Sequence, residues 1–86
     1  MVSQLVCIPV VLRKDCIDRE SLEELGTVTE TEEGWVVDYT ARVGYFLDDE
    51  TFMYYFYYAA GNLGLTTSDV VRFDWDKVEK IKRVLP

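Results

Sequence analysis

The feature that most constrains this chain is a stretch without charge from Thr51 to Leu65, in which six of the first eight residues are aromatic. Acids occupy positions 48–50, where negative charge stabilises a helix N-terminus. Gly61 and Gly64 lie at the other end, where a left-handed residue commonly ends a helix. One apolar stripe has helical spacing and contains Phe52, Phe56, Ala59 and Leu63. The sequence therefore predicts one helix over residues 48–65.

The other side of this helix carries tyrosines instead of the charged residues expected on a surface helix. They are Tyr54, Tyr57 and Tyr58. A helix that is apolar or aromatic on all sides is usually covered on more than one side. Two interpretations remain open. The tyrosines line the edges of a sheet, or they form an interface with another chain, including a second copy in a homodimer.

Charge is distributed unevenly along the chain, whose net charge is −7. Between Asp15 and Glu50 there are twelve acids and two bases. Such a surface repels nucleic acids and attracts basic partners, although many proteins use acids only for solubility. Acids on an edge strand also block unwanted strand pairing. The residues predicted to contact a basic partner are Glu30, Glu32, Glu33, Asp48, Asp49, Tyr54, Tyr57 and Tyr58.

The remaining segments predict a small α+β domain spanning residues 1–86. Strands are expected at 4–12, 27–32, 35–46 and 66–75, with a hairpin turn at Glu33-Gly34. Pro9 cannot donate to a ladder, so an edge position or a bulge is expected there. A short helix follows the first strand, with Asp18 as its N-cap. This order, βαββαβ, matches a ferredoxin-like split βαβ sheet, and residues 75–85 add a C-terminal helix.

A competing interpretation concerns the end of the chain. Residues 68–85 also have the spacing of a single amphipathic helix, through Val71, Trp75, Val78 and Ile81. The sheet would then have three strands and two long helices. The sequence leaves both alternatives open.

One pattern resembles the core of a helix-turn-helix. Its alanine, glycine and aliphatic positions correspond to Ala60, Gly64 and Val70. The resemblance implies a DNA-binding regulator that uses residues 60–72, with a recognition helix beginning near residue 66. The DNA-contacting residues would be Thr67, Ser68, Arg72 and Lys82. A helix-turn-helix needs a supporting helix directly before the motif, but a hairpin is predicted in that segment. The negative net charge of the chain also opposes binding to DNA phosphates.

Little in the sequence indicates catalysis. There is no histidine, no serine has an evident base partner, and the acids lack the spacing of a calcium loop. We therefore expect no enzyme activity, no metal and no cofactor. Cys7 and Cys16 do not form a disulfide framework, and a bridge between them is disfavoured in a reducing compartment. No stretch predicts a signal peptide or a membrane span, so a cytoplasmic location is expected.

Together these features favour a non-enzymatic, acidic protein-binding module. Its partner would be a protein with a basic surface, met by carboxylates and exposed tyrosines. Small inhibitors or regulators of nucleic-acid-binding machinery, including those of phages and viruses, often have this composition. The helix-turn-helix regulator is the alternative, and the secondary structure of residues 68–75 discriminates between the two.

Overall fold

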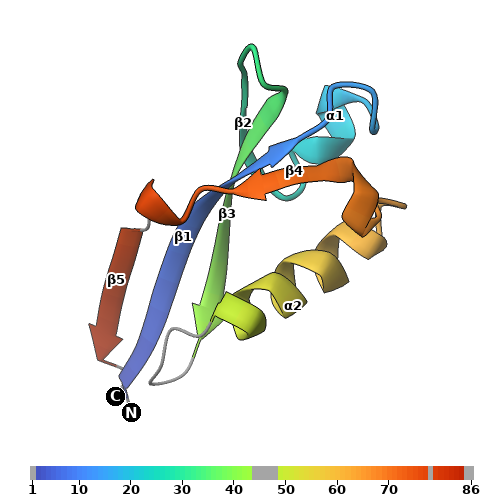
Figure 1. The fold of residues 1–86 in the computed structure, drawn as a ribbon. Coiled ribbons are helices and arrows are strands. Elements are labelled where there is room, and N and C mark those ends of the chain that lie inside the picture. The colour runs from blue at the N-terminus through green and yellow to red at the C-terminus, as the bar shows by residue number, and fades with distance from the viewer. Residues whose placement is uncertain (1, 44–48, 78, 85–86) are drawn as a thin grey trace.

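The computed structural model describes residues 2–43, 49–77 and 79–84, and the side chains of residues 5–41 and 49–77. It is an α+β fold in which a long helix crosses one face of an antiparallel sheet (Figure 1). The elements in chain order are β1 Val2–Leu12, α1 Arg19–Leu22, β2 Gly26–Glu30, β3 Trp35–Val43, α2 Asp49–Gly61, η1 Thr67–Asp69, β4 Val70–Phe73, η2 Trp75–Lys77 and β5 Glu79–Val84.

Strand β1 lies at the centre of the sheet, whose order is β2-β3-β1-β4. It pairs with β3 along nearly its whole length, from Gln4 opposite Val43 to Leu12 opposite Trp35. On its other edge, β1 pairs with β4 at residues 10–12 and with β5 at residues 2–7. Strands β4 and β5 therefore lie end to end along one edge of β1, separated by η2 (Figure 1).

The break between β4 and β5 explains how a central strand accepts Pro9. The expected edge position is wrong, and the one register shift of the β1–β4 pairing lies at Val11 and Leu12. The carbonyl of Pro9 accepts a hydrogen bond from the amide of Asp74, at 2.9 Å. Since the amide and carbonyl positions of one strand residue point to the same side, the missing N–H of Pro9 also points toward this break. No ladder hydrogen bond is lost there.

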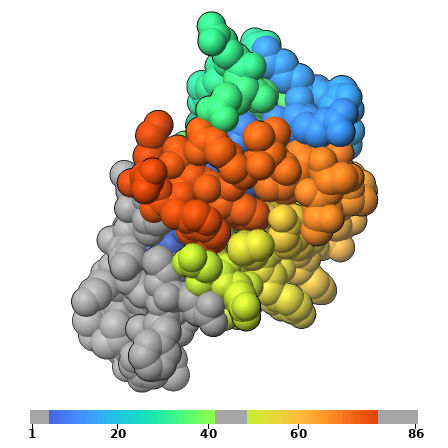
Figure 2. Space-filling model, in the orientation of Figure 1, coloured from blue at the N-terminus to red at the C-terminus, as the bar shows by residue number. Residues whose placement is uncertain are grey.

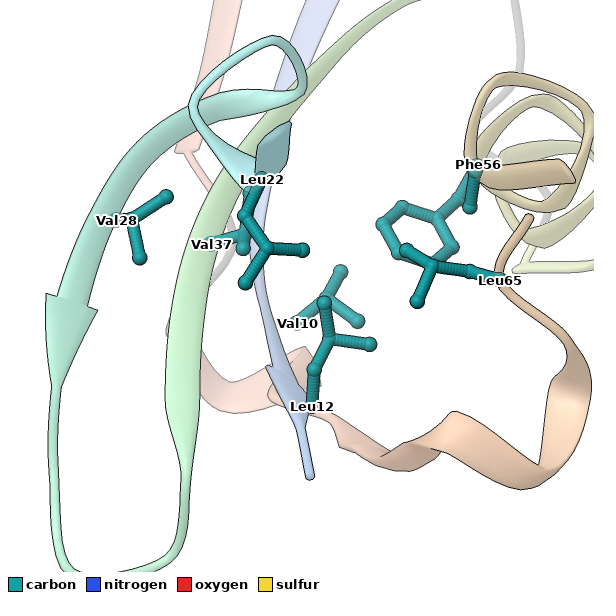
Figure 3. Close-up of a cluster of buried hydrophobic side chains, with 8 residues drawn as sticks. Val10, Leu12, Leu22, Val28, Val37, Phe56 and Leu65 are labelled. Carbon is teal, nitrogen blue, oxygen red and sulfur yellow. The ribbon is translucent and has the colours of Figure 1, made fainter. Parts of the chain in front are cut away.

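The core lies between the sheet and the helices. Alternate β1 side chains, Val6, Ile8, Val10 and Leu12, are fully buried and face Phe52 and Phe56 of α2. Val37 of β3 and Leu22 of α1 complete this layer, as the side chains pointing toward one another in Figure 3 illustrate. Burial of apolar area of this kind is the main stabilising term for a small domain. Both helices therefore pack on the same face of the sheet.

The predicted helix is confirmed as α2, although it ends at Gly61 and not at residue 65, and the expected left-handed glycine follows it. Gly64 has φ 86°, and the amide of Leu65 bonds the carbonyl of Ala60 while Gly64 bonds Gly61. These two hydrogen bonds form a Schellman motif, with the apolar contact between Ala60 and Leu65 that often accompanies it. Gly61 itself is helical, so Gly64 alone provides the stop.

The predicted helix over residues 75–85 is wrong, and so is the single helix over residues 68–85. Residues 75–77 form the 3₁₀ turn η2, and residues 79–84 form strand β5. The physical reason lies in β1, because β4 is too short to pair with the first half of that strand. Pairing with β5 satisfies backbone groups of β1 that a helix would leave without partners.

The hairpin turn and the first helix differ in their limits from the prediction. Thr31 and Gly34 exchange two backbone hydrogen bonds, at 2.9 and 3.2 Å, so Glu32 and Glu33 occupy the turn. Helix α1 has only four residues, and its N-cap is Asp18, as expected. The carboxylate of Asp18 accepts hydrogen bonds from the amide and the hydroxyl of Ser21, and these bonds lower its pKa.

Candidate functional site

The outward side of α2 carries a group of exposed aromatic side chains. Tyr54, Tyr55 and Tyr58 have exposed fractions of 66%, 42% and 69%. The rings of Tyr54 and Tyr58 stack with centroids 6.5 Å apart, and those of Tyr54 and Tyr55 meet edge-on at 6.0 Å. We call these three residues the tyrosine patch. Exposed aromatic clusters of this kind are enriched at protein interfaces.

Helical geometry explains the outward direction of two of these rings. Phe52, Phe56 and Ala60 are buried against the sheet at intervals of four residues. At 3.6 residues per turn, Tyr54 and Tyr58 project from nearly the opposite side of the helix. Their exposure agrees with the second of the two interpretations left open by the sequence, in which tyrosines of α2 face another chain.

Tyr57 and Tyr55 differ from the prediction. Tyr57 is half-buried, and its ring meets Phe56 at 5.7 Å and Phe73 of β4 at 5.8 Å. Burial also raises the pKa of Tyr57. Helical geometry places Tyr55 and Tyr57 at about the same angle from the outward direction. Phe73 of β4 contacts the Tyr57 ring and contributes to covering it, and the sequence gives no signal for the position of Phe73.

The charged residues of α2 itself are acids. Asp49 and Glu50 are exposed in the first turn of α2, and Glu50 precedes Tyr54 by one helical turn. Residues 49–61 contain no lysine or arginine. Asp48, also predicted as a partner contact, lies outside the described residues. The patch therefore combines aromatic surface with carboxylates at one end.

The acids of the β2–β3 hairpin do not join this surface. The hairpin lies at the top of Figure 2 and α2 lies below, with the β4–η2 segment between them. Glu30 forms an ion pair with Lys14 at 3.1 Å. Glu33 accepts two hydrogen bonds from Arg72, which lower its pKa. Glu32 is exposed in the turn. The predicted acidic and aromatic surface is therefore divided, and two of its carboxylates have partners within the chain.

The segment that resembled a recognition helix does not form one. Thr67 and Ser68 lie in a single 3₁₀ turn, η1, and Arg72 lies in strand β4. The carboxylate of Asp69 accepts a hydrogen bond from the Thr66 amide at 2.9 Å, which closes this turn. The β-branched Val70 then pairs with Leu12 at the end of β1. The side chain of Lys82 lies outside the described residues.

The chemical inventory of the described residues is small. Cys7 and Cys16 are free thiols, and burial raises the pKa of Cys16. No three histidine, cysteine or carboxylate side chains in the described ranges are grouped so that they could hold a metal ion. No helix in these ranges is long and apolar enough to cross a bilayer.

Comparisons with protein-family models, with curated proteins and with solved structures found no match. The function of this chain is therefore inferred from its own surfaces. Among the described residues, the exposed aromatic side chains are those of the tyrosine patch.

Proposed function

We propose that this protein is a non-enzymatic binding module whose tyrosine patch contacts a partner protein with a basic surface. The observation that carries this proposal is the exposure of Tyr54, Tyr55 and Tyr58 as one continuous group on α2. Tyrosine tolerates water in the free protein and contributes strongly when an interface covers it. A stable monomer has no need for three such rings together in solvent.

The negative charge of the protein favours a positively charged partner. Its net charge of −7 and the acids at the start of α2 favour a partner rich in lysine and arginine. Arginine can also stack on tyrosine faces, which adds a cation–π attraction at the same surface. Proteins that bind nucleic acids carry such basic surfaces. A small intracellular inhibitor or regulator of that machinery is the role that we infer.

We also infer a ferredoxin-like arrangement of the first four strands. The order β2-β3-β1-β4 with antiparallel neighbours supports it, as do helices α1 and α2 packed on one face. Strand β5 is an addition to that arrangement, since it extends the β4 edge of the sheet along β1.

The experiment that tests the function is partner capture with matched variants. Wild-type protein, the double variant Tyr54→Ser/Tyr58→Ser and the control Val71→Ser are immobilised at equal density. Val71 is a suitable control because it is an exposed apolar residue that belongs to β4 and not to α2. Circular dichroism establishes that each variant is folded before capture.

We expect basic proteins that bind the wild type and Val71→Ser but not the double tyrosine variant. Loss of each hot-spot tyrosine weakens binding roughly 30-fold. Association with the captured partner should also slow as salt increases. Equal capture by all three proteins would refute the proposal. Sedimentation that shows a dimer dispersed by the tyrosine substitutions would assign the patch to self-association.

A further inference from the structure

The face of the sheet opposite α2 carries a groove. Both helices pack on the face formed by Val6, Ile8, Val10 and Leu12, so the intervening side chains of β1 point the other way. Two adjacent hollows of about 310 and 230 Å³ lie on that opposite face. They share Pro9, Asp38 and Lys77 as lining residues, so together they form one groove. We call it the open-face groove.

The floor of the open-face groove is apolar. It is formed by Pro9 and Val11 of β1 and by Val36 of β3. Val11 is buried although no helix covers it, because it lies between Val36 and Arg72 in the sheet. The aliphatic part of a long side chain fits against such a floor.

The bases that line the groove already have carboxylate partners. Arg72 bonds Glu33 and lies 3.7 Å from Asp74, and Lys77 lies 3.8 Å from the same carboxylate. Asp38, which lines both hollows, has no ion pair or side-chain hydrogen bond with any of the described residues. It is partly buried and lines the groove beside the apolar floor. Among the described lining residues, Asp38 is therefore the carboxylate without a cationic partner, so a positively charged ligand group is favoured beside it.

We propose that the open-face groove binds one lysine or arginine side chain from an extended segment of a partner protein. The cationic head pairs with Asp38, and the methylene groups lie on Pro9 and Val11. The larger hollow is near the lower end of the size range of ligand sites, which suits one long side chain. The net charge of the chain attracts the same kind of ligand.

This site is independent of the tyrosine patch, because α2 packs against the opposite face of the sheet. The two surfaces can therefore be disabled separately. Failure of the partner-capture experiment leaves the groove proposal intact, and failure of the groove experiment leaves the tyrosine patch intact.

The test is an NMR titration of the ¹⁵N-labelled chain with the capped tripeptide acetyl-Ala-Arg-Ala-amide. The neutral peptide acetyl-Ala-Gln-Ala-amide is titrated in parallel. Asp38→Asn removes the charge and keeps the size of the side chain. Asp76→Asn is the matched control, since Asp76 is an exposed acid outside the groove. Tyr54→Ser/Tyr58→Ser is the control for the other surface.

We expect saturable shifts of the backbone amides of Cys7, Asp38 and Lys77 with the arginine peptide only. Asp38→Asn should weaken binding at least about tenfold, and added salt should weaken it further. Binding should persist in Asp76→Asn and in the tyrosine variant. The proposal is overturned by equal shifts with the glutamine peptide, by shifts that survive Asp38→Asn, or by no shifts. Shifts that follow protein concentration without peptide would assign the groove to a second copy, which also overturns it.

Discussion

Arg72 on β4 donates two hydrogen bonds to the carboxylate of Glu33 in the β2–β3 hairpin, with distances of 2.9 and 2.7 Å. The two residues are 39 positions apart in the chain, and strand β1 separates β4 from β3 in the sheet. Both side chains remain about half exposed, so the pair contributes modestly to stability. Its clearest effect is on the titration of Glu33.

Replacing Arg72 with glutamine should raise the pKa of Glu33 toward its ordinary value of 4.5. The hydrogen bonds from Arg72 are the main cause of the lowered pKa in the folded protein. Because the folded pKa is lower than the unfolded one, the pair stabilises the fold above pH 4.5. This contribution is lost as the pH falls through the lowered value. A carbon-detected NMR titration of the glutamate carboxyl groups measures the change.

Lys14→Gln is the control for that titration, because it removes the ion pair with Glu30 and leaves Glu33 and Arg72 unchanged. The pKa of Glu33 should be the same in Lys14→Gln as in the wild type. An unchanged pKa of Glu33 in Arg72→Gln would show that the two side chains do not pair in solution.

Phe52→Ala should destabilise the protein by about 3–5 kcal/mol, the range for a buried phenylalanine that leaves a cavity. Phe52 is fully buried, and its ring contacts Tyr39 at 5.6 Å and Trp75 at 6.0 Å. Tyr54→Ala, two residues further along α2, should change the free energy of unfolding by less than about 0.5 kcal/mol. Urea denaturation measures both. Similar losses in the two variants would contradict the assigned orientation of α2.

The spacing of apolar residues was sufficient to predict the strands and helices that bury one face against the core. The alternation of the sequence from Trp35 onward puts Val37 and Ala41 on the same face of β3, and both are buried. The spacing of Phe52 and Phe56 likewise gave the inward side of α2. In both elements one apolar face must meet the core, so local pattern and tertiary structure agree.

The spacing of apolar residues did not predict secondary structure or exposure where contact with a strand distant in the sequence determines them. Residues 79–84 have only helical spacing, with Ile81 and Val84 three positions apart, and they form a strand because they pair with the edge of β1 that β4 leaves free. The exposure of Tyr55 and the burial of Tyr57 depend on Phe73 in the same way. Asp38, whose carboxylate has no partner among the described residues, also had no sequence signal, because the partners of nearby charges became evident only from the fold.

Gly34→Ala should destabilise the β2–β3 hairpin. Gly34 has φ 148°, and an added Cβ would clash with the carbonyl oxygen of Leu12. That neighbour is backbone, so relief requires a shift of the end of β1. We expect a loss of at least about 1 kcal/mol in urea denaturation. Wild-type stability in Gly34→Ala would mean that the hairpin does not approach β1 so closely.

The two glycines at the end of α2 should respond to alanine in opposite directions. Gly61 is helical and has open space around its Cα, so Gly61→Ala should stabilise the protein by about 0.5–1 kcal/mol. Gly64 also has open space but has φ 86°, so Gly64→Ala should cost about 1–2 kcal/mol through backbone strain alone. Thermal and urea unfolding of the two variants and the wild type measure both changes. Since neither substitution creates a steric clash, opposite signs report the backbone conformation directly. Equal effects would show that α2 does not end in the Schellman motif at Gly64.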